Sequence, residues 1–127
     1  MSRYMVRICS DGQIERIPCK GILKLDTLQK LVGGYIETVP VRMKPEEGVW
    51  PLLIVDEEGR LKGKPLNTAA TLLADVPHGI VGDAVLVGAM GAELIGVSRE
   101  TADKVAECLG ALYVCKKEEK HEPDRDL

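Results

Sequence analysis

The segment LLIVDEEGRLKGKPLNTAAT, residues 52–71, decides the fold. Its first four residues are apolar on both faces, which is typical of a strand at the centre of a sheet. The acidic turn at residues 56–59 then directs the chain into a basic hairpin with a short return segment at Arg60 and Leu61. Asn67 follows at the position of a helix N-cap. We therefore expect the sheet to be built outward from this strand.

Upstream of this segment, residues 4–17 alternate apolar and polar side chains around an Asp-Gly turn, which predicts a β-hairpin. Asp26 is placed to cap a short helix, and Gly33 is placed to end it in the left-handed conformation. Residues 35–43 then form a predicted strand, and Pro40 within it favours an edge position because proline has no amide hydrogen to donate.

Downstream, residues 84–87 form a second buried run, and residues 93–97 are expected to pair with it. Ser98 caps the last predicted helix, which Gly110 is expected to end. Residues 116–127 mix both charges with almost nothing apolar, which is typical of a flexible tail.

The order of these elements is that of an α+β protein. A chain of 127 residues fits one compact domain, here residues 1–115, followed by the charged tail at 116–127. We expect a mixed, mainly antiparallel sheet of five or six strands, with two or three helices on one face.

The composition limits the partners of this chain. Apolar residues make up 45% of it and aromatic residues only 3%, with no Phe, so the core is built from aliphatic side chains. A net charge of −3 gives no overall field that attracts nucleic acid, and general nucleic-acid binding is disfavoured. The sequence shows no signal-peptide pattern and no apolar run of about 20 residues, which favours a cytoplasmic protein that does not enter membranes.

The residue types of an active site do not cluster in this sequence. His78 and His121 are its two histidines, and the latter lies in the predicted tail. Ser10 and Ser98 are explained by a turn and a helix cap, and a GxSxG elbow is missing. The four cysteines show no zinc-type spacing. We therefore expect no catalytic residue, metal or cofactor. The sequence favours a binding protein over an enzyme.

The first candidate binding motif is Gly33-Gly34, followed by Tyr35 and Glu37. Paired glycines let a ligand or another chain approach the backbone closely. The ring of Tyr35 could stack on a planar ligand, and the Glu37 carboxylate could accept a hydrogen bond. The alternative is a helix stop followed by a turn and a half-buried strand.

The second candidate motif consists of Arg60, Lys62, Lys64 and Asn67, in which three cations precede a helix N-terminus. Cations and unpaired helix amides together suit a phosphate group. The motif has neither Walker nor GxGxxG spacing, so neither an ATPase nor a dinucleotide fold is implied. The alternative is a solvated hairpin whose cations balance the acidic residues 56–58.

These motifs resemble a family of small domains of unknown function from phages and mobile elements of Gram-positive bacteria. The shared pattern is LQ..VGG.IE followed by DEEG.L.G.P.N..A, and it covers about residues 25–100 of this chain. The resemblance implies a phage or prophage origin and action in the host cytosol, with no assigned activity. The matching residues are Leu28, Gln29, Val32, Gly33, Gly34, Ile36, Glu37, the run 56–59, Leu61, Gly63, Pro65, Asn67, Ala70, Gly82 and the run 85–88.

Three hypotheses of function follow. The leading one is a non-enzymatic binding protein that sequesters a nucleotide-type host immune signal, an anti-defence role by analogy with other small phage proteins. The second is a protein-interaction module that inhibits a host factor through a sheet edge or through the loop of Trp50, the sole tryptophan. The weakest is a small hydrolase of the same signal. We expect a homo-oligomer, at least a dimer, because a site between subunits gains depth.

Overall fold

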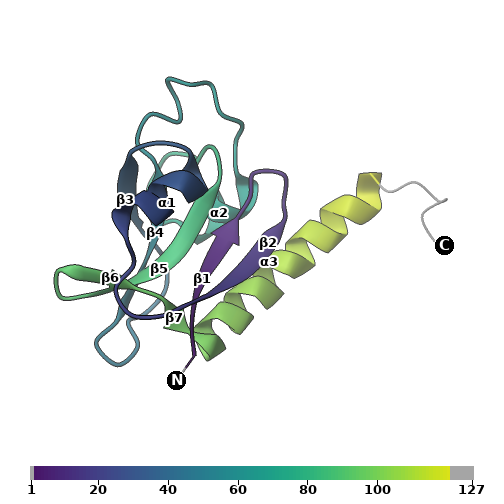
Figure 1. Ribbon diagram of the computed structural model, residues 1–127. Coiled ribbons are helices and arrows are strands. Elements are labelled where there is room, and N and C mark those ends of the chain that lie inside the picture. The colour runs from purple at the N-terminus through teal and green to yellow at the C-terminus, as the bar shows by residue number, and fades with distance from the viewer. Residues whose placement is uncertain (1, 121–127) are drawn as a thin grey trace.

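The computed structural model describes the backbone of residues 2–120 and the side chains of residues 2–110. Over residues 2–120 it confirms the α+β class, with one seven-stranded sheet and three helices in a single compact domain (Figure 1). Each strand pair in the sheet is antiparallel. Within the described residues, we find no helix that is both long and apolar enough to cross a membrane.

Five strands form the body of the sheet in the order β2-β1-β5-β4-β3, with β6 paired to β5 and β7 paired to β1. The predicted N-terminal hairpin and the pairing of the run at residue 93 with the central strand are both confirmed. The strands are β1 (Arg3–Ile8), β2 (Ile14–Cys19), β3 (Ile36–Pro40), β4 (Trp50–Asp56), β5 (Ala84–Met90), β6 (Glu93–Ile95) and β7 (Val97–Ser98), and the helices are α1 (Leu25–Val32), α2 (Thr68–Leu73) and α3 (Arg99–Lys120).

The helices lie on both faces of the sheet, although the sequence predicted them on one. Helices α2 and α3 pack against the face that carries Leu53 and Leu86. Helix α1 packs against the opposite face, where Leu28 contacts the side of the sheet that carries Ile54 and Val85. The reason is the strand β4, which is apolar on both faces and so requires cover on both sides.

The ends of α1 and β3 follow local sequence. Gly33 ends α1 with a left-handed φ of 82°, as predicted, and its amide donates to Gln29 O. The cap at the other end was predicted wrongly, because Lys24 occupies it without a side-chain bond and Asp26 lies in the first turn. Strand β3 is an edge strand, as Pro40 indicated.

Three features of the secondary structure differ from those expected. The sheet has seven strands rather than five or six because β7 has two residues, too few to show a period. Residues 60–61 form turns rather than a return strand. Helix α3 continues past Gly110 through Lys120, so residues 116–120 of the predicted tail are helical, and residues 121–127 lie outside the described residues. A glycine inside a helix costs only about 1 kcal/mol, which the helix-forming residues after it offset.

Candidate functional site

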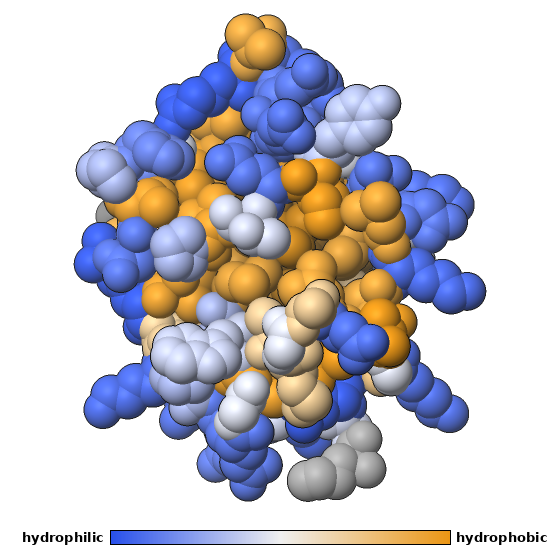
Figure 2. Space-filling view, turned by 90° about the vertical axis from the view of Figure 1, so that its left-hand side faces the viewer, coloured by the Kyte–Doolittle hydropathy of each residue, from blue (hydrophilic) through white to orange (hydrophobic). Residues whose placement is uncertain are grey.

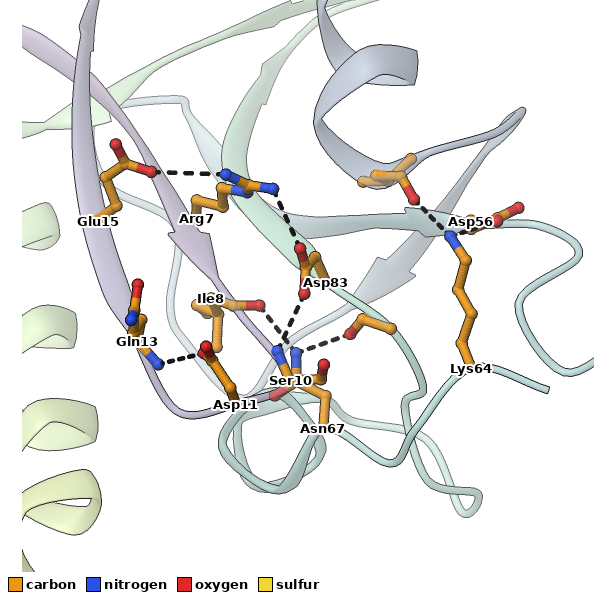
Figure 3. A network of polar contacts seen from close by, with 12 residues as sticks. Arg7, Ile8, Ser10, Asp11, Gln13, Glu15, Asp56, Lys64, Asn67 and Asp83 are labelled. Atoms are coloured by element: carbon orange, nitrogen blue, oxygen red, sulfur yellow. Dashed lines mark hydrogen bonds and ion pairs between the residues drawn. The ribbon is translucent and has the colours of Figure 1, made fainter. Parts of the chain in front are cut away.

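The two candidate motifs meet at Asp56, the last residue of β4. The Asp56 side chain is 1% exposed, and its Oδ2 atom lies 2.8 Å from Lys62 Nζ and 2.7 Å from Lys64 Nζ. Figure 3 shows Lys64 reaching across to Asp56 beneath the end of a helix. We call these three residues the Asp56 cluster. One buried carboxylate therefore holds two lysines from the following loop.

The same lysines bind the C-terminal end of α1. Lys62 Nζ donates to Gly33 O at 3.0 Å, and Lys64 Nζ donates to Val32 O at 2.7 Å. The last carbonyls of a helix lack partners within the helix and carry its negative dipole end, so ammonium groups stabilise them. The glycine turn and the basic loop thus form one polar unit.

Both glycines are explained by contacts inside this unit. A Cβ atom at Gly34 would lie 2.5 Å from Asp56 Oδ1 and 2.6 Å from Lys62 Nζ, closer than real Cβ contacts. At Gly33 the φ of 82° disfavours other residues, and a Cβ atom would lie 3.1 Å from Lys64 Nζ. The sequence predicted that a ligand or another chain could approach this backbone closely. The groups that approach it are side chains of the chain itself.

The Asp56 carboxylate is ionised at any ordinary pH. Burial by itself raises the pKa of Asp56, but hydrogen bonds from Lys62 and Lys64 and from the Glu58 amide lower this pKa to about 2. The Glu58 amide donates to Oδ1 at 2.9 Å, so both carboxylate oxygens are bonded. The cluster accordingly carries one negative and two positive charges.

The loop that supplies the lysines is held by its own backbone. The amide of Lys62 donates to Glu58 O and that of Lys64 to Gly59 O, each at 3.0 Å. The Glu57 amide donates to Tyr35 O at 2.8 Å, which joins the loop to the start of β3. Leu61 is 87% exposed in the middle of this loop. The loop therefore presents a leucine to solvent from a backbone with little freedom.

Two of the predicted contact residues lie apart from the Asp56 cluster. Arg60 turns away from it, with Nη2 3.0 Å from His78 Nδ1 and also bonded to Gly79 O. Asn67 is buried and caps α2, as predicted, by accepting from the Ala70 amide.

The remaining hydrogen-bonding capacity of Asn67 is used inside the fold. Its Nδ2 atom donates to Ile8 O and to Gly82 O, both at 2.8 Å, as Figure 3 shows for Ile8. Asn67 thus joins α2 to the end of β1 and to the entry of β5. No polar atom of its side chain is left for a ligand.

The other two residues of the first motif are Tyr35, just before β3, and Glu37 within it. Tyr35, 67% exposed, lies beside the loop through its bonded carbonyl. Ile36 pairs with Asp56 and Glu37 pairs with Val55. Because successive strand residues point to opposite faces, the Glu37 side chain lies on the other face of the sheet from Asp56. Tyr35 and Glu37 are both exposed, and Glu37 lies apart from the Asp56 cluster.

The second polar network in Figure 3 is structural. Arg7 Nη2 lies 3.1 Å from Asp83 Oδ2, and the Ser10 amide donates to Asp83 Oδ1 at 3.0 Å. Arg7 Nη1 is 3.8 Å from Glu15. These contacts join the β1–β2 hairpin to the start of β5, and they leave the Asp56 cluster untouched.

Asp56 is the residue that sequence reasoning missed as the centre of the site. Its signal was an acidic residue directly after a strand that is apolar on both faces, with cations six and eight positions later. In the part of the chain with described side chains, no three His, Cys, Asp or Glu residues lie close enough together to hold a metal ion.

The fold and the site define a class, an antiparallel sheet domain that carries a polar loop at the end of β4, the strand between the central β5 and the edge strand β3. Residues 3–110 match the family model described as "Domain of unknown function (DUF3846)", and the chain belongs to this family. The resemblance noted from the sequence to a domain family of unknown function is thereby confirmed. Neither the curated proteins nor the solved structures give a match.

Proposed function

We propose that this protein acts by binding and inhibiting another protein, which it contacts through residues 57–64, here called the Asp56 loop. The observation that carries the proposal is Leu61, which is 87% exposed on a loop fixed by the buried Asp56. Exposed single leucines are common, but this one lies on a loop held by Asp56 and hydrogen-bonded to exposed Tyr35, and tyrosine is enriched in binding hot spots.

The rigidity of the loop favours binding because ordering a flexible loop costs free energy on association. Here the lysine contacts with Asp56 and with the end of α1 already order the loop in the free protein. Tyr35 adds an exposed ring beside the loop, and the Lys62 side chain remains 39% exposed. A partner with an apolar pocket and acidic groups near it fits this surface.

The test is affinity capture with the full chain as bait in a lysate of the host, followed by titration of the recovered protein. Leu61→Asp is expected to weaken its binding at least about 30-fold, the scale of a hot-spot residue. The matched control is Leu72→Asp on α2, an exposed leucine outside the loop. Equal binding by the Leu61 variant and the wild type would overturn the proposal.

A second candidate is the sequestration of an anionic, nucleotide-type immune signal by a phage or mobile-element protein in the host cytoplasm. The convergence of the glycine turn with Lys62 and Lys64 favours it, as does the excess positive charge of the Asp56 cluster. In this arrangement the anion would contact Lys62 from solvent, with Tyr35 as a stacking surface.

This candidate is tested by incubating the protein with a panel of nucleotide signals, removing it by filtration, and analysing the ligand before and after heat denaturation. Intact ligand released by heat supports sequestration, and an altered ligand indicates a hydrolase. Lys62→Glu should abolish capture, with Lys30→Glu on α1 as the control. If the concentration of free ligand does not change at micromolar protein, both sequestration and hydrolysis of a nucleotide signal are excluded.

A further inference from the structure

We infer that two copies of this chain associate through the part of the sheet that α1 leaves uncovered. We call this surface the Trp50 face, and the observations that support it are independent of the Asp56 loop. Its centre is Trp50, which is 61% exposed at the first residue of β4. The other members are Leu52, Ala89, Leu94, Ile22 and Leu25.

The face is open because α1 is too short to cover it. Eight residues of helix are about 12 Å long. The five strands in the body of the sheet span about 19 Å at their usual spacing. On the opposite face the sheet is packed by both α2 and the much longer α3. The face covered by α1 therefore retains apolar surface beyond the ends of that helix.

Strand register places the members of the Trp50 face next to one another. Trp50 pairs with Ala89, and Ala89 pairs with Leu94, so these three residues form a row on one face. The Leu23 amide donates to Leu94 O at 2.8 Å, which brings the segment with Ile22 and Leu25 to the same edge. Figure 2 shows apolar side chains gathered in the middle of the side that carries β3 and β6, with polar side chains around them.

The exposed apolar area suits the core of an interface. Trp50 alone leaves roughly 100–150 Å² in water, given the area that a buried tryptophan removes. With the half-exposed Ile22 and Leu25 and the partly exposed leucines, the patch is on the order of 400 Å². That is about half of the area per subunit in an interface of standard size, and a polar rim would supply the rest.

A second copy is the occupant that this surface fits best. In a two-fold symmetric pair each surface meets itself, so an apolar row without charged side chains meets another such row. Charges of both signs flank the face in the sequence, with Lys24 beside Leu25 and Glu47 three residues before Trp50. In a pair related by a two-fold axis, Lys24 of one copy can meet Glu47 of the other, and both side chains are exposed.

The test uses the full chain and its single tryptophan as a reporter. Sedimentation equilibrium is expected to show a monomer–dimer equilibrium, and the Trp50 emission should shift to the red and become accessible to iodide as the protein is diluted. Trp50→Lys and Leu94→Lys should each weaken dimerisation about 30-fold or more. Leu72→Lys on α2, a leucine exposed to a similar extent as Trp50 but outside the face, should leave it unchanged.

Circular dichroism of each variant distinguishes loss of association from loss of fold, and Leu94→Lys keeps the tryptophan reporter. A monomer at 100 µM with solvent-accessible Trp50 would overturn the inference. So would a dimer in which Trp50 stays accessible and Trp50→Lys has no effect. Protection of Trp50 only after a different protein is added would assign the face to that partner instead, and would equally contradict a homodimer.

Discussion

Asp56 shows how one side chain determines the local structure around it. A carboxylate buried at the end of β4 requires compensation, which it receives from two ammonium groups and one backbone amide. Because those ammonium groups also bind Val32 O and Gly33 O, the compensation extends to the end of α1. Loss of Asp56 would leave both lysines without their carboxylate, and loss of either lysine would leave Asp56 with a single cation.

Substitution of Gly34 by alanine tests the close packing around this carboxylate. The new methyl group would lie within 2.6 Å of both Asp56 Oδ1 and Lys62 Nζ, so we expect Gly34→Ala to reduce the free energy of unfolding by about 1–3 kcal/mol. Gly110→Ala in α3 is the control, because open space surrounds it and alanine favours helix by about 1 kcal/mol. Urea denaturation measures both, and an unchanged Gly34 variant would contradict the contacts.

The low pKa of Asp56 predicts a loss of stability in acid. A folded-state pKa of about 2 against an ordinary 3.8 contributes about 2 kcal/mol, fully present above pH 4 and lost as the pH falls towards 2. Denaturation of the wild type and of Asp56→Asn at pH 6 and at pH 2.5 should show this extra loss in the wild type only. Equal pH dependence in the two proteins would contradict the ion pairs.

Single residues were predictable where their role is local. The left-handed Gly33 and the cap at Asn67 follow from sequence alone, because each acts within a few residues. The role of Asp56 was not predictable in the same way. It depends on which way β4 faces and on how far α1 lies from it, and neither is contained in a local pattern.

At the scale of elements, Asn67 illustrates how a cap also connects a fold. Its oxygen caps α2, and its Nδ2 atom bonds carbonyls at the end of β1 and before β5. The sequence predicted the first function and assigned the residue to a ligand site as well. The structure shows that its side-chain polar atoms are already paired within the protein.

Two substitutions at Asn67 separate these functions. Asn67→Asp keeps a capping oxygen but sets a second oxygen against two carbonyls, and we expect it to lower the free energy of unfolding by about 3 kcal/mol or more. Asn67→Ser keeps the cap without that repulsion and should cost less. Thermal denaturation of both variants shows which one is less stable. An Asp variant as stable as the Ser variant would contradict the buried geometry.

The elements that were mispredicted share a cause. The two-residue strand β7 exists because it pairs with the distant strand β1. The basic hairpin is a series of turns because Lys62 and Lys64 are drawn towards Asp56 rather than into a ladder. Local propensity is a weak guide wherever such long-range contacts compete with it.

At the scale of the whole molecule, the two faces of the sheet differ in how far helices cover them. The face under α2 and α3 holds the larger core, while α1 covers only part of the other. That asymmetry leaves the Trp50 face open for the dimer that we propose. The Asp56 loop, where we propose that a partner binds, lies at the end of α1. The α+β class could be deduced from sequence, and the two apolar faces of β4 call for cover on both sides. Which helix covers which face depends on the final sheet order and could not be deduced.

Hydrogen exchange on the full chain tests most directly the claim that the glycine turn and the basic loop form one rigid unit. In the wild type, the amides of Gly33, Glu58, Lys62 and Lys64 should be protected, since each donates a hydrogen bond. In Asp56→Asn, protection in residues 32–35 and 57–64 should fall together while β1 and β5 keep theirs. Rapid exchange of residues 57–64 in the wild type, or loss in only one of the two segments, would contradict the account.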